Sequence, residues 1–342
     1  MNLLSSVIRA VERSPLPDPL VRMGIGLLVA RTARMLAATR DSAESDFARA
    51  MSSYPIAQHP DTANKQHYEL PPQFFALTLG PQRKYSCCLY PTGKETLEQA
   101  ECLALEEIVA HADLFDGQSI LELGCGWGSL TLFLAQKFPR SIITAVSNSN
   151  PQRLYIEAEA AARGLTNVRL MTADMNEFAA NGLHDRIVSI EMFEHMSNWQ
   201  ALLARARSWL EPNNGRLFIH VFSNIHSPYR FDHNNPADWI SQHFFTGGIM
   251  PSHGLMRHFA DCFVIERDWW RSGLHYQRTA LDWLARFDTN GQPILRILED
   301  VYGTEAALWR QRWRLFYLAT AGLFGHAGGR QWGVSHYLLR PT

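Results

Sequence analysis

The middle of the chain alternates between short apolar runs and longer segments in which apolar residues recur at helical spacing. The short runs predict buried strands, and the longer segments predict amphipathic helices. Strands that alternate with helices through short connections form a parallel, doubly wound α/β sheet. The predicted strands are 119–123, 142–146, 168–172, 185–190 and 216–222, and the predicted helices between them are 129–138, 151–163 and 199–210.

The segments before this alternation have a different pattern. Residues 1–66 read as helical between prolines, so we expect a helical N-terminal appendage to a domain that spans 67–342. Residues 20–38 mix apolar positions with arginines, and such a helix lies on a membrane surface, binds a partner or packs on its own domain. Prolines and aromatic residues without a period predict loops over 67–75 and 84–90, and apolar spacing predicts a helix over 95–113.

After the fifth predicted strand the β/α alternation stops. Residues 223–262 are rich in aromatic residues and contain Gly247 and Gly248, which suits an insertion that closes over a substrate as a lid. We then expect a strand over 263–270, a helix from about Ala280, a long helix over 303–324 and a final antiparallel strand over 332–339.

Composition argues against several classes of protein. The formal net charge is -1 at pH 7, so bulk electrostatics do not favour a nucleic-acid partner. The 5 cysteines are scattered and the histidines are dispersed, so we expect a reducing, cytoplasmic location and no metal site. Apolar runs are short and the first residues lack a basic start, so we expect neither a membrane-spanning segment nor a signal peptide.

The turn after the first predicted strand carries the first functional signal. Glu122 is followed by glycines at alternate positions, and an amphipathic helix begins directly afterwards. Glycine allows a turn with positive φ and lets a ligand approach the backbone, while the N–H groups of a helix N-terminus attract a carboxylate or phosphate. The third glycine comes one residue too early for the dinucleotide fingerprint. The three glycines are Gly124, Gly126 and Gly128.

This acid-x-Gly-x-Gly-x-Gly pattern resembles the first motif of class I S-adenosylmethionine (SAM)-dependent methyltransferases, which holds the amino acid end of the cofactor. Another glycine-rich turn of an α/β protein is the alternative. Many of these enzymes have an acidic residue for the ribose after the second strand; here Asn148, Ser149 or Gln152 would form those hydrogen bonds. After the third strand, Asp174 suits the adenine amine and Met175 suits the ring face.

A cluster of polar residues after the fourth predicted strand carries the second signal. Glu191, Glu194 and His195 would lie on one side of a helical turn. Two carboxylates beside an imidazole can tune each other's pKa and provide a general base. A solvated acidic turn is the alternative, but ligands of such sheets bind at the carboxyl ends of the strands.

Several longer motifs occur in order along the chain. Together they resemble the cyclopropane-fatty-acid synthase superfamily and, within it, the plant coclaurine-type N-methyltransferases. The resemblance extends from about residue 65 to the C-terminus. It implies a SAM-dependent enzyme with a Rossmann-like, seven-stranded, mostly parallel sheet, and it places Tyr85 and Ser86 at the cofactor. The motifs are Tyr85-Ser-Cys-Cys88, Ile190-Glu-Met-Phe-Glu-His-Met196, Phe244-Phe-Thr-Gly-Gly-Ile-Met-Pro-Ser252 and Ser272-Gly-Leu-His-Tyr276.

In the lipid enzymes of this superfamily the acceptor is an unsaturated acyl chain of a phospholipid. The resemblance implies a bicarbonate ion that removes a proton after methyl transfer, and peripheral membrane contact, which the N-terminal helices could provide. These enzymes usually have a small residue at the position of Glu191 and a proline at that of Thr246. The positions that match the bicarbonate ligands are Cys87, Glu194, His220, the Phe222 backbone and Tyr276.

In the N-methyltransferases the acceptor is a small amine, which must be neutral to attack the methyl group. Residues that match Glu191, Glu194 and His195 are tied there to amine binding and proton removal. We therefore predict a methyltransferase for a small amine, with Glu194 and His195 as the base and Glu191 on the nitrogen. The acyl-chain acceptor is the alternative, a non-catalytic binding protein on the same fold is a third hypothesis, and a homodimer is a further one.

Overall fold

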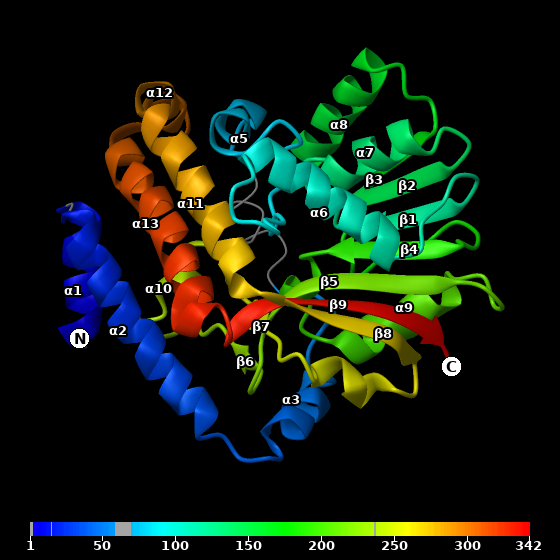
Figure 1. Ribbon diagram of the computed structural model, residues 1–342, viewed down its shortest axis with the longest axis horizontal. Coiled ribbons are helices and arrows are strands. Elements are labelled where there is room, and N and C mark those ends of the chain that lie inside the picture. Colours follow the sequence, from blue (N-terminus) through cyan, green and yellow to red (C-terminus); the bar gives the residue numbers. More distant parts are fainter. Residues whose placement is uncertain (1–2, 15, 59–69, 236) are drawn as a thin grey trace.

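The computed structural model describes residues 3–14, 16–58, 70–235 and 237–342, and a seven-stranded sheet runs through this part of the chain (Figure 1). The strand order is β3-β2-β1-β4-β5-β9-β8. Neighbours from β3 to β5 pair in parallel, and β9 pairs antiparallel with both β5 and β8. The predicted doubly wound sheet with a final antiparallel strand is confirmed. The strands are β1 (Ser119–Leu123), β2 (Ile142–Ser147), β3 (Val168–Thr172), β4 (Arg186–Ile190), β5 (Arg216–Asn224), β8 (Phe263–Ser272) and β9 (Trp332–Pro341).

Helices cover both faces of the sheet, which is why its central strands read as continuous apolar runs. On one face, Leu105 and Leu134 belong to a buried cluster with Ile120. On the other face, Trp199 and Leu203 pack in a cluster with residues of β1, β4 and β5. The first face carries α6 (Leu97–His111), α7 (Ser129–Lys137) and α8 (Asn150–Ala162), and the second carries α9 (Trp199–Ser208).

A layer of helices with an aromatic core packs beside the sheet (Figure 1). The ring of Trp313 lies 4.8 Å from that of Phe74, and Phe287 packs against the same Phe74 ring. This layer contributes Tyr276 to the candidate site described below. Its helices are α5 (Pro72–Thr78), α11 (Gly273–Thr289), α12 (Gly291–Tyr302) and α13 (Ala306–Gly325).

Three expectations about this layer are wrong. The predicted loop over 67–75 ends in α5, because a proline at the first helical position fixes a helical φ; residues 67–69 lie outside the described part. Helix α11 begins at Gly273 rather than near Ala280, because the Ser272 hydroxyl accepts from the Leu274 N–H at 3.3 Å and caps the helix. Helix α12 has no counterpart among the predicted elements.

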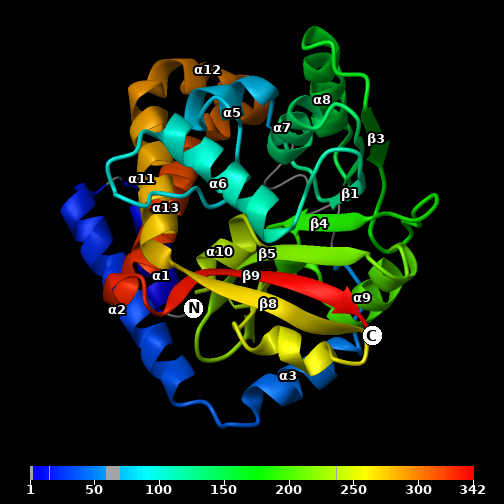
Figure 2. The same ribbon diagram turned by 45° about the vertical axis from the view of Figure 1, so that its right-hand side comes forward.

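The described part of the N-terminal appendage is mainly helical. Its helices are α1 (Leu3–Arg13), α2 (Asp18–Ala37) and α3 (Ala43–Met51). Helices α1 and α2 lie along α13, whereas α3 lies against the insertion (Figure 1, Figure 2). One side of α2 is buried through Val21, Val29, Ala33 and Leu36, and its other side leaves Leu20, Met23, Leu27 and Met35 exposed. The predicted boundary at residues 66 and 67 lies outside the described residues. No helix in the described part is long and apolar enough to span a bilayer.

The described residues of the predicted insertion over 223–262 form only short elements. Residue 236 is not described. Strand β5 continues to Asn224 before the insertion departs from the sheet. Glu44 of α3 accepts from the Ser252 hydroxyl, and its Oε1 lies 3.0 Å from His258 Nε2. These contacts join the appendage to the insertion. The short elements are β6 (Tyr229–Arg230), α10 (Trp239–His243), β7 (Ile249–Met250) and a 3-10 turn over Leu255–Phe259.

One buried carboxylate joins the appendage, the insertion and the helical layer. Glu12 accepts from Trp239 Nε1 at 2.8 Å and from Arg312 Nε at 2.9 Å, and it lies 3.3 Å from His243 Nε2. Burial alone raises the pKa of Glu12, but the hydrogen bonds from His243, Trp239 and Arg312 outweigh it and lower the pKa to about 2. The ionised form is therefore stabilised by folding.

We expect Glu12→Gln to lower the free energy of unfolding at pH 7 by about 1–3 kcal/mol. Because the pKa of Glu12 is lowered in the fold, its contribution is present above the unfolded value of about 4.3 and fades as the pH falls toward 2. Denaturant unfolding of both proteins from pH 7 to pH 3 measures the difference. The exposed Glu299→Gln is the control, and a difference for Glu12→Gln that does not narrow in acid would contradict the prediction.

Candidate active site

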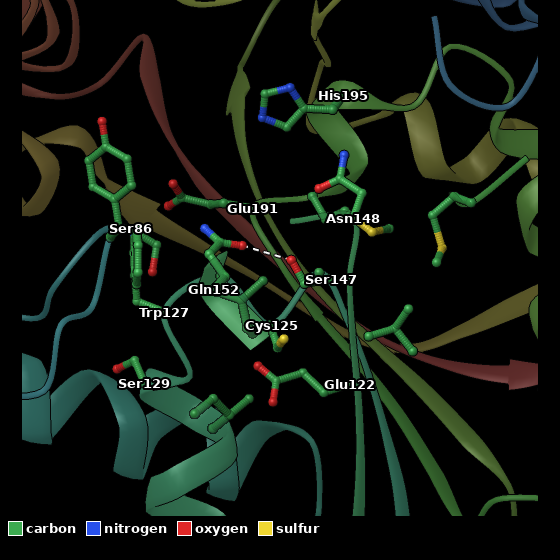
Figure 3. A pocket seen from close by; sticks show the side chains of 18 of the residues that line it. Ser86, Glu122, Cys125, Trp127, Ser129, Ser147, Asn148, Gln152, Glu191 and His195 are labelled. Atoms are coloured by element: carbon green, nitrogen blue, oxygen red, sulfur yellow. Dashed lines mark hydrogen bonds between the residues drawn. The ribbon is translucent and has the colours of Figure 1, made fainter. Parts of the chain in front are cut away.

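A pocket opens at the carboxyl ends of β1, β2, β3 and β4, where the doubly wound sheet predicts a site (Figure 3). Its volume is about 1190 Å³, counting the open mouth. In Figure 3, Glu191 and His195 lie on one side of the pocket and Glu122 on the other. The predicted residues that line it are Tyr85, Ser86, Glu122, Gly124, Gly126, Asn148, Gln152, Asp174, Met175, Glu191 and His195.

The glycine turn has the backbone that its sequence predicts. Gly124 has φ +80, and a Cβ there would lie 2.8 Å from the Met192 Cβ. Gly128 has φ +78, and a Cβ there would lie 2.7 Å from Ile156. Gly124 and Gly126 line the pocket, whereas Gly128 caps α7 and allows the close packing of α8. Gly128 therefore shapes the turn without facing the pocket.

Glu122 is a buried carboxyl on the pocket wall. Its one hydrogen bond among the described residues comes from the Thr131 hydroxyl at 2.5 Å. Burial raises the pKa of Glu122 to about 8, and the Thr131 hydrogen bond offsets only part of that effect. A carboxyl with so little compensation is suited to a ligand that brings a positive charge.

The end of β2 holds a hydrogen-bonded pair at the pocket wall. The Ser147 hydroxyl donates to Gln152 Oε1 at 2.7 Å, as Figure 3 shows, and accepts from the Ser149 N–H at 3.0 Å. Asn148 and Gln152 line the pocket, whereas Ser149, a buried residue directly before α8, does not. After β3, Asp174 accepts from the Asn176 backbone N–H at 2.8 Å.

Several buried polar atoms around the pocket lack a hydrogen-bond partner among the described residues. They are Trp127 Nε1, Ser129 Oγ and Gln152 Nε2. A buried donor without a partner costs about 1–3 kcal/mol, so such atoms indicate a ligand or water that completes them. These residues and Glu122 meet the needs of a polar cofactor with an amino acid end.

Glu191 has an unusual backbone and a dense set of hydrogen bonds. Its φ is +49, a left-handed conformation that is uncommon outside glycine and that clusters at functional sites. Its Oε1 accepts from the Cys87 backbone N–H at 2.9 Å and lies 3.1 Å from His220 Nε2. Its Oε2 accepts from the Tyr276 hydroxyl at 2.6 Å. Burial raises the pKa of Glu191, and the positive charge of Lys84 and these hydrogen bonds limit the rise.

The prediction that Glu191, Glu194 and His195 share one side is wrong for Glu194. Glu191 and His195 line the pocket, but Glu194 is fully buried behind it, and its Oε1 accepts from the Phe222 backbone N–H at 2.6 Å. The reason is local: the 3-10 turn spans only Phe193–His195, and the left-handed Glu191 precedes it. Burial and the nearby Glu191 charge raise the pKa of Glu194 well above its usual range, which favours the protonated form.

His195 presents a neutral imidazole to the pocket. Its ring stacks on Phe245 with the centroids 4.8 Å apart and an interplanar angle of 11°. Burial lowers the pKa of His195 to about 4, and the neighbouring Glu191 charge only partly opposes that effect. At neutral pH the ring therefore carries no charge.

Cys87, His220 and Tyr276 come together as predicted, but they contact Glu191 from behind rather than line the pocket. Cys87 uses its backbone N–H, and its thiol donates to the Cys88 carbonyl at 3.3 Å. Burial raises the pKa of the Cys87 thiol well above its usual range, so this thiol is not a nucleophile at neutral pH.

Among the pocket-wall residues that were not predicted from the sequence are Lys84, Trp127 and Ser129. Lys84 is buried, and its Nζ donates to the Ser86 hydroxyl and the Cys87 carbonyl, both at 2.6 Å. The position of Lys84 directly before the Tyr-Ser-Cys-Cys motif is the feature of the sequence that could have identified it as a site residue. Ser129 is the first residue of α7, where a helix N-terminus faces the glycine turn.

The expected dispersal of histidines does not hold in the fold. Glu107, His111 and His336 place a ligand atom each within 4.8 Å of one another, outside the pocket. The Arg271 guanidinium donates to Glu107 and lies 3.4 Å from His111 Nε2. A fixed positive charge at those atoms disfavours a metal cation there.

Comparison with known proteins identifies the family. The family model for mycolic acid cyclopropane synthetase matches residues 57–325. The chain is similar to (S)-coclaurine N-methyltransferase of Thalictrum flavum subsp. glaucum, with 32% identity over 349 residues that cover 99% of this chain and 96% of the relative. It is also similar to cyclopropane-fatty-acyl-phospholipid synthase of Escherichia coli (strain K12), with 28% identity over 225 residues that cover 65% of this chain and 56% of the relative.

A solved structure agrees over the whole length. Coclaurine N-methyltransferase bound to N-methylheliamine and SAH (S-adenosylhomocysteine) superimposes with a TM-score of 0.94 and 31% sequence identity, covering 99% of this chain and 100% of that chain. The described fold, including the appendage, thus follows one known enzyme closely. The chain belongs to the mycolic acid cyclopropane synthetase family and is a SAM-dependent methyltransferase of class I fold.

Proposed function

We propose that this enzyme transfers a methyl group from SAM to the nitrogen of a small amine. The observation that carries the proposal is the position of the Glu191 carboxylate. It accepts from Cys87 and Tyr276 and contacts His220, which are three of the five groups that the resemblance assigns to bicarbonate in the lipid enzymes. A carboxylate of the chain thus stands where those enzymes need an exchangeable ion, so we propose no bicarbonate requirement. The likeness to amine N-methyltransferases supports the same acceptor class.

The pocket walls fit SAM, which supplies the methyl group as an electrophile. We assign its amino acid end to Glu122 and the glycine turn, because a buried carboxyl complements an ammonium and the N-terminus of α7 complements a carboxylate. Asn148 and Gln152 line the wall assigned to the ribose, and Asp174 and Met175 line the wall assigned to adenine. The partnerless Gln152 Nε2 supports this assignment.

The chain's own residues must then deprotonate and orient the acceptor amine. An aliphatic ammonium cannot attack a methyl group, so a base has to remove its proton. Glu191 suits this role, because it lines the pocket and its pKa is raised toward the working pH. His195 stays neutral and orients the acceptor beside the Phe245 ring. This proposal differs from the sequence prediction, which made Glu194 and His195 the base and placed Glu191 on the nitrogen; Glu194 is turned away from the pocket.

We further propose that the appendage can touch a membrane surface or a second copy of the chain. The exposed Leu20, Met23, Leu27 and Met35 of α2 support such a contact. Cytoplasmic location stays a prediction from the sequence.

The acceptor class is tested with methyl-labelled SAM. We expect label to pass to a secondary amine such as coclaurine, with the same rate in buffer freed of bicarbonate and in buffer supplied with it. Vesicles of unsaturated phospholipid should remain unlabelled. Label in the acyl chains, or a rate that depends on bicarbonate, would contradict the proposal.

The roles of the two glutamates are separated by matched amide variants. Glu191→Gln should lower kcat by about 10²–10⁴-fold, because the amide keeps the shape but cannot take a proton. Glu194→Gln should lower kcat by less than about tenfold, because an amide resembles the protonated carboxyl already present. Steady-state kinetics on the amine and SAH titration measure both. Equal losses in the two variants would sink the division of roles, and SAH affinity within a few-fold of wild type confirms intact folding.

The raised pKa of Glu122 makes cofactor binding depend on pH. Below about pH 8 the empty site is protonated, and a ligand ammonium requires the carboxylate, so binding must expel a proton. The SAH dissociation constant should therefore rise as the pH falls from 8 to 6, by up to about tenfold per unit. Calorimetry in buffers of different ionisation enthalpy counts the released proton. Glu122→Gln should flatten the profile while Glu299→Gln leaves it unchanged, and an unchanged slope in Glu122→Gln would refute this linkage.

A further inference from the structure

A continuous row of histidines leads away from Glu191. His220 Nε2 lies 3.1 Å from Glu191 Oε1, and His220 Nδ1 lies 2.9 Å from His336 Nε2. His336 Nδ1 lies in turn 2.8 Å from His111 Nδ1. The rings come from β5, β9 and the last turn of α6, so three elements far apart in the sequence build one chain of hydrogen bonds. None of these three rings lines the pocket.

The row runs from the interior to partly exposed groups. His220 and His336 are 4% and 2% exposed, and His111 is half-buried, stacked on Trp269 with the centroids 3.9 Å apart. Beyond it lie Arg271 and Glu107, whose side chains are 30% and 15% exposed. The far end of the row therefore reaches water by a route separate from the pocket mouth.

We propose that His220, His336 and His111 relay the proton of the acceptor amine from Glu191 to solvent. The inference rests on the proposed amine acceptor. With cofactor and amine both bound, they fill the pocket through which water reaches Glu191, yet the amine must lose its proton before it can attack. While the pocket is filled, a proton that stays on Glu191 can return to the amine, so export along the row keeps the amine neutral until the methyl group is transferred.

The transfer balances along the row. A neutral imidazole has one donor and one acceptor nitrogen, so each ring can take a proton at one side and release one at the other. Protonated Glu191 gives its proton to His220 Nε2, His220 Nδ1 passes one to His336 Nε2, and His336 Nδ1 passes one to His111 Nδ1. His111 Nε2 then releases a proton to water. Glu191 is again ionised, and every ring carries its proton on the nitrogen nearer Glu191.

The starting arrangement is restored in the empty enzyme. A proton taken up at His111 Nε2 passes inward through the same rings and leaves from Glu191 through the open pocket. Arg271 can only donate, so its guanidinium 3.4 Å from His111 Nε2 favours release of the proton at that atom during turnover. Each turnover thus exports one proton, and the methylated product leaves as an ammonium ion.

The charges around the row keep its rings neutral, as a relay requires. Burial lowers the pKa of His220 and of His336 well below their usual range, and the positive charge of Lys84 acts in the same direction on both. Burial also lowers the pKa of His111. The negative charge of Glu107 acts in the opposite direction, and the positive charges of Arg271 and Arg267 lower this pKa further.

A glutamine at position 111 tests the relay. In His111→Gln the amide can keep a hydrogen bond to His336 but cannot pass a proton on, and the half-buried site tolerates the change. We expect kcat for a strongly basic secondary amine to fall by at least about tenfold, with KM and SAH affinity within twofold of wild type. Millimolar imidazole in the assay should restore part of the rate.

A weakly basic amine distinguishes a loss of proton transfer in His111→Gln from a general loss of structure. An acceptor whose ammonium pKa lies below the assay pH binds neutral and has no proton to export, so wild type and His111→Gln should methylate it equally. His336→Gln should repeat the pattern, and His253→Gln, which contacts Ser335 next to His336, should behave as wild type on both amines. Equal losses on the two amines, or no loss on either, would overturn the relay while leaving amine methylation intact. Failure of the wild type to methylate any amine would remove both proposals.

Discussion

The site depends on keeping one carboxylate ionised while it is buried. An unpaired charge in a protein interior costs several kcal/mol, so the chain must bring hydrogen-bond donors to Glu191 from every side. The Cys87 backbone N–H in the loop before α6 and the Tyr276 hydroxyl of α11 donate to it, and Lys84 adds a positive charge. The aromatic helical layer therefore has a chemical role, because it presents Tyr276 to the end of the sheet.

The same constraint explains the neighbouring Glu194. Two carboxylates in one buried volume cannot both ionise without a large penalty, so the one with more donors holds the charge and the other keeps its proton. Among the residues that the structure describes, the Glu191 carboxylate contacts three groups, whereas the Glu194 carboxyl has one hydrogen bond, from the Phe222 backbone N–H. The left-handed φ of Glu191 turns its side chain out of the 3-10 turn and so separates the two roles.

The sheet and the glycine turn were predictable because their signals are local. Apolar runs, alternating glycines and Glu122 before the turn each act within a few residues, and the structure agrees with them closely. The direction of Glu194 was not predictable, because it depends on a backbone φ and on a partner in another strand. The row through His111, His220 and His336 could not be predicted for the same reason. These residues lie on α6, β5 and β9, and the sequence does not show that β5 and β9 are neighbours in the sheet or that the end of α6 reaches them.

A tethered carboxylate changes what the rest of the fold must supply. An exchangeable ion such as bicarbonate can leave the site together with the proton it has taken, and a fresh ion replaces it. The carboxylate of Glu191 cannot leave, so a proton that it accepts stays beside the amine, while cofactor and amine fill the pocket, unless it travels onward. The contact of Glu191 with His220, and of His220 with His336, lies on the side away from the pocket, where such a route has to begin. Under the proposed roles, the choice of Glu191 as the base and the row of histidines behind it therefore depend on each other.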